Sequence, residues 1–98
     1  MIKARGLVKS GNLFGAVRYL EKLEGKGQGS DESRALLSEA RATLTHNTET
    51  LLSAGDELYD QGQVREAVAL WQAALAIDPF NLDARRKSEQ ALRSLATE

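Results

Sequence analysis

The most constraining feature of this 98-residue chain is the stretch Thr48–Asn81, in which two helical patterns flank one tight turn. The turn is expected at residues 60–63 (DQGQ), where Gly62 supplies the conformational freedom that a tight turn needs. The second pattern ends at Pro79, because proline cannot continue a helix and pushes Asp78 out of the helical region. The stretch therefore predicts an antiparallel pair of helices.

Small and apolar residues in this stretch are spaced so that the two helices can pack closely. Leu51 and Leu58 lie on one face of the first helix, because they are separated by two helical turns. The second helix carries apolar residues at spacings of three and four, which is typical of a buried stripe. They are Val64, Ala67, Val68, Trp71, Ala74 and Leu75.

The same residues resemble a known repeat. Five of them fall at the spacings of a tetratricopeptide repeat, whose period is 34 residues. They are Gly55, Ala67, Trp71, Ala74 and Pro79, and residues 48–81 fill one whole period. Leu51, Ala54 and Leu58 depart from the family, which often carries Trp, Leu and Tyr at these places, but all three are apolar. The resemblance implies an all-α fold of antiparallel helical hairpins stacked as a superhelix. It also implies that Gly55 faces Ala67, which lets the two backbones approach at a cost of roughly 1 kcal/mol in helix propensity.

Residues 1–30 resemble a second repeat of this kind, degenerate and truncated. When the two turn glycines are aligned, Gly11 matches Gly62 and Ala16 matches Ala67. The offset is one period and a half of the 34-residue repeat. We therefore expect the same kind of hairpin at both places.

A glycine-rich loop is expected to follow the N-terminal hairpin. The helices of that hairpin are predicted at residues 1–10 and 13–24, and the loop EGKGQGSD covers residues 24–31. Its glycines lack the spacing of a phosphate-binding loop, and no strand precedes it. We interpret the loop as a linker.

The span Asp31–Asp60 is predicted to be one long helix. Ser30 or Asp31 can cap its start, no proline interrupts it, and its apolar residues keep a near-heptad stripe. The stripe contains Leu37, Ala40, Leu44, Leu51 and Leu58, with Asn47 and Ala54 at the remaining core-facing positions. The alternative is a break at residues 45–48, where poor helix formers cluster and Asn47 could cap a new helix.

A last helix is expected over residues 82–96, with Asn81 as its N-cap. Its modestly apolar face suits the capping helix that repeat arrays need, although it could also begin a further repeat. This face contains Leu82, Ala84, Ser88, Ala91, Leu92 and Leu95. We predict a single helical-repeat domain, 1–98. Its parts are a degenerate repeat with the glycine loop (1–30), a helical extension (31–47), the tetratricopeptide-like repeat (48–81) and the capping helix (82–98).

Composition excludes several classes of function. The chain has no cysteine and one histidine, His46, so we expect no metal site, no cofactor and no catalytic residues. The net charge is −1, which argues against nucleic-acid binding by the short basic run at residues 85–87. No segment is apolar enough for a membrane span. The N-terminus carries no signal-peptide core. The sequence does not fix the compartment: the cytoplasm and a bacterial periplasm or envelope both stay open, and the envelope is implied by resemblance alone.

Charge is spread unevenly along the chain. Residues 1–29 hold six basic and two acidic residues, whereas residues 30–63 hold two basic and seven acidic residues. Residues 64–98 hold five of each. This distribution is typical of solvated helix faces, but it could also draw two copies together or steer a ligand.

The resemblance implies a binding surface on the concave side, lined by first-helix side chains. Tyr59 is the expected anchor, because it is a rigid aromatic residue with a polar tip. The other candidates are Glu49, Leu52, Asp56 and Asp60 in the full repeat, and Arg5, Val8 and Lys9 in the degenerate one. The family's clamp for chaperone C-terminal carboxylates needs Lys and Asn, but Leu52, Ser53 and Asp56 occupy the comparable places. The acidic surface favours a basic or neutral polar ligand.

The sequence therefore predicts a protein-interaction module, a scaffold or adaptor that binds a peptide or partner protein without chemistry. The alternative is a self-assembly segment, because one and a half repeats expose apolar faces and arrays usually need about three units. Homodimerisation of a piece of a larger bacterial repeat protein would fit this alternative, since the run ALWQAALAIDP looks bacterial.

Overall fold

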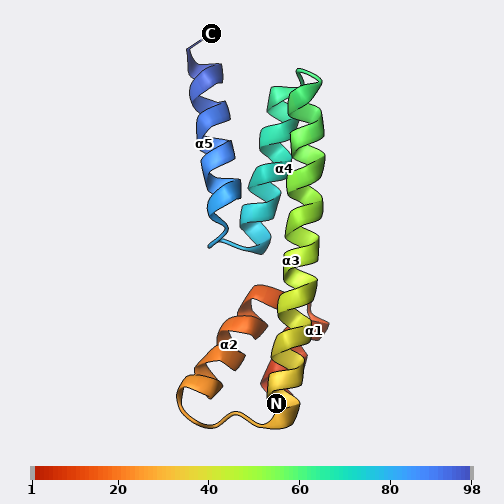
Figure 1. Ribbon diagram of the computed structural model, residues 1–98, viewed down its shortest axis with the longest axis vertical. Coiled ribbons are helices and arrows are strands. Elements are labelled where there is room, and N and C mark those ends of the chain that lie inside the picture. The colour runs from red at the N-terminus through yellow and green to blue at the C-terminus, as the bar shows by residue number, and fades with distance from the viewer. Residues whose placement is uncertain (1, 98) are drawn as a thin grey trace. The chain divides into compact units, whose positions relative to one another are not determined.

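The computed structural model describes residues 2–97, and this part of the chain is all α-helical (Figure 1). The helices are α1 (Ile2–Lys9), α2 (Leu13–Gly25), α3 (Asp31–Asp60), α4 (Val64–Ile77) and α5 (Leu82–Ala96). The predicted all-α fold of helical hairpins is confirmed. None of the described helices combines the length and the apolar character that crossing a membrane would require.

Side-chain caps define where three of the helices begin. Asn12 accepts a hydrogen bond from the Gly15 amide (2.9 Å) at the start of α2. Asn81 accepts one from the Ala84 amide (2.9 Å) at the start of α5, as predicted. At the start of α3, the Ser30 hydroxyl accepts a hydrogen bond from the amide of Ser33 (3.1 Å). Each such cap contributes about 1 kcal/mol, because it satisfies an amide that has no partner inside the helix.

The two hairpin turns share one backbone conformation. Gly11 and Gly62 have φ values of +85° and +82°, a region that side chains other than glycine rarely adopt. The predicted match between these two glycines is confirmed. Ala16 and Ala67, the second predicted match, are both fully buried.

Helix α3 is continuous over Asp31–Asp60, so the predicted long helix is confirmed and the alternative break at residues 45–48 is wrong. Threonines are tolerated in its middle because their hydroxyls bond to the backbone of the preceding turn. Thr43 donates to the Glu39 carbonyl (3.1 Å), and Thr50 donates to the His46 carbonyl (2.9 Å).

The chain divides into two compact units, residues 1–45 and 46–98, and the division falls inside α3. In the first unit, α1 and α2 pack on each other and bury Ala4, Ala16, Val17 and Leu20, while α3 buries Leu37, Ala40 and Leu44. Exposed ion pairs link α3 to both preceding helices in this unit. They are Arg5–Glu32, Arg34–Glu24 (2.8 Å) and Arg41–Glu21 (2.7 Å).

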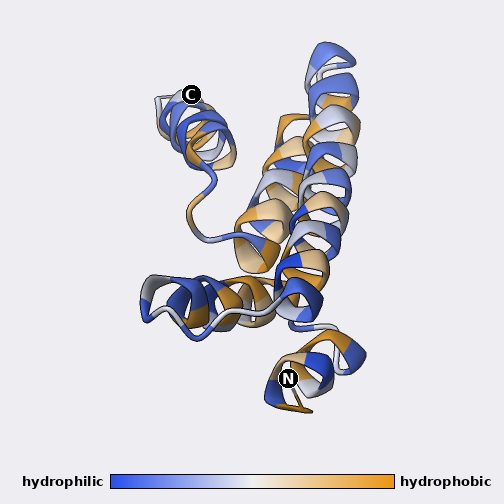
Figure 2. Cartoon of the chain, turned by 60° about the horizontal axis from the view of Figure 1, so that its bottom comes forward, coloured by the Kyte–Doolittle hydropathy of each residue, from blue (hydrophilic) through white to orange (hydrophobic). Residues whose placement is uncertain are grey.

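In the second unit, α4 lies between the C-terminal part of α3 and α5 (Figure 1). Many of its residues are hydrophobic (Figure 2). The core consists of Ala67, Val68, Trp71 and Ala91, with Leu52, Leu58 and Val64 packed against it. Helix α4 buries most of the predicted stripe, whereas Val64 and Leu75 are only partly buried.

Two sequence-based expectations about the core are wrong. Asn47 is exposed, and Thr48 is buried instead at 1% exposure, because the buried face of α3 follows the 3.6-residue helical period rather than a strict heptad. On α5, Leu82 (74% exposed) and Leu92 do not join the buried face that Ala84, Ser88 and Ala91 form. The small residues allow α5 to lie close to α4, and the two leucines lie on other faces of α5.

Candidate functional site

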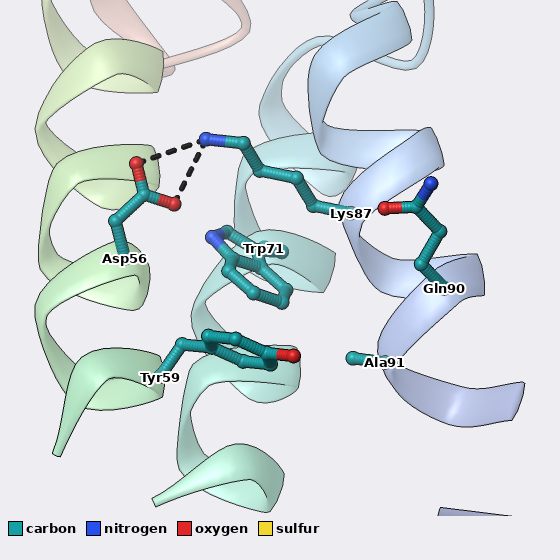
Figure 3. A pocket seen from close by; sticks show the side chains of 6 residues that line it. All are labelled: Asp56, Tyr59, Trp71, Lys87, Gln90 and Ala91. Atoms are coloured by element: carbon teal, nitrogen blue, oxygen red, sulfur yellow. Dashed lines mark hydrogen bonds and ion pairs between the residues drawn. The ribbon is translucent and has the colours of Figure 1, made fainter. Parts of the chain in front are cut away.

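A cavity of about 210 Å³ opens in the second unit, where three helices contribute side chains to one hollow (Figure 3). Helix α3 supplies a carboxylate and a phenol ring, α4 supplies an indole ring, and α5 supplies an ammonium group, an amide and a methyl group. The lining consists of Asp56, Tyr59, Trp71, Lys87, Gln90 and Ala91. The cavity therefore combines an apolar interior with polar groups at its rim, which is typical of a binding pocket.

Trp71 forms the apolar floor and is 4% exposed, as the predicted core role requires. The indole occupies space that a glycine leaves open: a Cβ added to Gly55 would lie 2.7 Å from Trp71 Cδ1. The atoms nearest to a Cβ at residue 55 thus belong to Trp71. That Gly55 also faces Ala67 stays a prediction. The indole nitrogen donates a long hydrogen bond (3.4 Å) to the Leu52 carbonyl. Glycine at residue 55 therefore creates the site by admitting a large ring.

Tyr59 forms the aromatic wall and is 45% exposed. Its ring lies beside Trp71, with centroids 5.7 Å apart and planes inclined by 38°, and its hydroxyl points toward α5 in Figure 3. Within residues 2–97 the side chains of Tyr59 and Gln90 make no hydrogen bond. An aromatic face and two uncommitted polar groups are thus available to a ligand.

An ion pair between Asp56 and Lys87 crosses the rim of the cavity from α3 to α5 (Figure 3). The Lys87 ammonium lies 2.8 Å from Asp56 Oδ1 and 2.9 Å from Oδ2, so it engages both carboxylate oxygens. The Lys87 side chain is 32% exposed and the Asp56 side chain is 47% exposed, so water reaches both members of the pair. Such pairs contribute little net stability, because water screens the attraction.

Helix α5 brings its three cavity residues to one face because they are spaced by one helical turn. Lys87 precedes Gln90 by three residues and Ala91 by four. None of the three is a predicted binding residue, because residues 85–87 form a basic run in the sequence and the rest of the helix resembles a cap. The spacing alone indicated a shared face, but not which helix that face meets.

The structure distributes the eight predicted binding residues over several surroundings. Asp56 and Tyr59 line the cavity, Leu52 packs against the core, and Asp60 is exposed. Glu49 lines a separate open hollow together with His46.

The predicted residues of the N-terminal unit have their own surroundings. Arg5 pairs with Glu32, and Lys9 is exposed at the end of α1. Val8 lines an apolar hollow of about 240 Å³ with Leu13, Leu36 and Ala40 among its neighbours. All three residues, and the neighbours named for them, belong to the first unit.

Potential metal ligands do not gather into a site. Across residues 2–97, no three His, Asp or Glu side chains are placed so that they could hold an ion together. His46 is exposed on α3. The polar chemistry of the cavity is therefore an ion pair, an amide and a phenol, groups that recognise a ligand by hydrogen bonding and charge.

Comparison with known proteins gives one match. A family model described as a TPR (tetratricopeptide) repeat matches residues 55–87, which run from the glycine under Trp71 to the lysine at the rim of the cavity. No curated protein and no solved structure matches the chain.

Proposed function

Residues 55–87 form a tetratricopeptide repeat, and from this we propose that the chain is a protein-interaction module that docks a peptide or partner protein on the surface around Tyr59. Repeats of this family are interaction modules. The proposal assigns the docking surface to the cavity lined by α3, α4 and α5.

The observation that carries the proposal is the half-exposed Tyr59 ring above the buried Trp71. An exposed aromatic residue over a desolvated pocket is the typical anchor of a protein interface. Because rigid helices hold Tyr59 and Trp71 in place before binding, little conformational entropy is lost on this surface when a partner binds.

The charges around the cavity favour a basic or neutral polar partner. No Lys or Arg occurs between Arg41 and Arg65, and this interval contains four acidic residues. Asp60 lies one helical turn beyond Asp56 and makes no ion pair within residues 2–97, whereas Glu49 and Glu57 line the separate hollow beside His46. A partner with acidic groups would add repulsion on this face of α3.

Selection of peptides from a random displayed library against the purified chain tests the proposal. Selected peptides should bind in a fluorescence-polarisation assay, and Tyr59→Ala should weaken them about tenfold, which corresponds to a hot-spot contribution near 1.4 kcal/mol. Tyr19→Ala, which removes the other tyrosine from the N-terminal unit, is the matched control and should leave binding unchanged. Equal effects of the two substitutions would refute the assignment of the surface.

Self-assembly is the second candidate, and the exposure of Leu82 (74%) and Leu92 (45%) on α5 favours it. Paired α5 faces would remove these side chains from water. Light scattering behind size exclusion over a wide concentration range tests it: a mass that rises with concentration supports self-assembly, and a constant monomer mass excludes it.

A further inference from the structure

We propose that Asp56 receives a cationic side chain of the partner, and that Lys87 occupies this place in the free protein as an intramolecular competitor. The inference rests on the proposed function and adds the chemistry of the ligand: a lysine or arginine next to an apolar residue. It assigns Asp56 and Lys87 opposite effects on affinity, although they form one ion pair.

The free protein already shows which group fits against Asp56. The Lys87 ammonium lies within 2.9 Å of both carboxylate oxygens, at the rim of a cavity with two aromatic rings. This ammonium comes from α5, at the end of a long flexible stem, and not from the helix that carries Asp56. A partner ammonium or guanidinium can make the same contacts once Lys87 turns away to solvent.

Exchange of one cation for another costs little, because both side chains of the pair are partly exposed. A partly exposed ion pair contributes little net stability, and the partner's cation replaces the lost contact with an equivalent one. The net gain then comes from the apolar residue beside that cation, because it removes the exposed face of Tyr59 from water. The face of Tyr59 can also attract the cation directly.

Charge complementarity selects a basic rather than an acidic partner. Asp60 lies one helical turn beyond Asp56 on α3 and has no ion pair within residues 2–97. An acidic side chain would have to take Lys87 from Asp56 and would leave that carboxylate without its cation beside a like charge. Such a mismatch disfavours the wrong ligand.

Two substitutions of similar size separate the roles of the pair. Lys87→Met keeps the aliphatic stem and removes the competitor, so we expect affinity for a basic peptide to rise about two- to fivefold, the range that one exposed ion pair allows. Asp56→Asn removes the acceptor and frees Lys87, so affinity for the same peptide should fall about fivefold or more. Arg86→Met is the matched control, because Arg86 pairs with Asp83 outside the cavity, and it should change nothing.

The probes are two short synthetic peptides in which leucine alternates with lysine or with glutamate. Fluorescence polarisation gives their dissociation constants at low and high salt, and far-UV circular dichroism verifies that each variant is helical. The native chain should prefer the lysine peptide, Lys87→Met should strengthen this preference, and Asp56→Asn should reverse it. High salt should reduce all three differences.

The outcomes separate this inference from the function on which it rests. Equal binding of the two peptides, with loss on Tyr59→Ala, would overturn the inference and leave the interaction module standing. The inference would also be overturned if Lys87→Met weakened the lysine peptide as much as Asp56→Asn does, because the pair would then support the pocket as a unit. If neither peptide bound any variant, and displayed libraries also gave no ligand, both proposals would be refuted.

Discussion

The hairpins α1–α2 and α3–α4 share one turn geometry but fill the space between their helices with different side chains. In both hairpins, the amide of the turn glycine donates a hydrogen bond of 3.0 Å to the carbonyl three residues earlier. The acceptor is the Val8 carbonyl in the first hairpin and the Tyr59 carbonyl in the second. The amide of the next residue donates a hydrogen bond to the carbonyl five residues earlier. The Asn12 amide donates to the Leu7 carbonyl (2.8 Å), and the Gln63 amide donates to the Leu58 carbonyl (2.9 Å). The backbone scaffold is therefore common to both.

The difference lies in one buried pair of positions. The first hairpin has Ala4 and Leu20, and the second has Gly55 and Trp71 at the corresponding positions; all four residues are buried. Removal of one methyl from the first helix admits an indole in place of an isobutyl group. The larger ring lies beside Tyr59, and together with residues of α5 these two rings line the cavity of the second unit. The comparison teaches that one turn conformation permits very different surfaces.

The largest effect is expected from Trp71→Ala, which should destabilise the second unit by about 3–5 kcal/mol, because it removes a large buried ring and leaves a void. Urea unfolding followed by far-UV circular dichroism, with hydrogen exchange of α4 and α5 amides, measures this loss. Leu20→Ala should cost about 2–4 kcal/mol and act on the first unit. Identical losses located in the same amides for both variants would contradict the two-unit description.

A double-mutant cycle over Gly55 and Trp71 tests whether the two hairpins differ by this pair alone. Gly55→Ala should cost about 1–3 kcal/mol in the native background, because the new methyl would overlap the indole. In the Trp71→Leu background, which recreates the pair of the first hairpin, the same change should stabilise by roughly 1 kcal/mol through helix propensity. A coupling energy near zero in urea unfolding would show that the indole does not occupy the glycine's space.

Substitution of the turn glycines should have equal effects in the two hairpins. Gly11→Ala and Gly62→Ala each place a side chain in the left-handed region, so each should cost about 1–2 kcal/mol. Space is not the reason, because a Cβ at either glycine would meet no atom within 4 Å. Thermal unfolding compares the two; a much larger loss at one glycine would break the equivalence of the turns.

The smallest effect concerns the caps at the starts of α2 and α4. Asn12→Ala should cost about 1 kcal/mol, because the Gly15 amide loses its acceptor. Gln63, at the equivalent place before α4, makes no side-chain cap. Gln63→Asn should therefore stabilise by about 0.5–1 kcal/mol, and thermal unfolding should show shifts of opposite sign for the two variants. A fall in stability on Gln63→Asn would show that the turns differ in more than their capping residue.

Much of the fold could be predicted from local signals in the sequence. Gly62 and Pro79 indicated where helices end, because the backbone conformations that glycine and proline favour do not depend on neighbouring side chains. Asn81 marked a helix start for the same reason. The site was only partly predictable: Asp56 and Tyr59 were candidates, whereas Lys87 lies 31 residues beyond its partner and nothing local connects them. Whether the eight candidate residues bind a ligand stays a prediction.

What the sequence determined by itself is therefore the set of helices, their ends, the long α3 and the burial of Trp71, because these depend on propensity, capping and periodicity within a few residues. Tertiary structure alone decided that Gly55 meets Trp71, that Thr48 rather than Asn47 is buried, and that Lys87 reaches Asp56. These depend on how one helix is rotated against another, and a rotation of one residue, about 100°, changes every such contact. The cavity belongs to this second class, because its walls come from three helices.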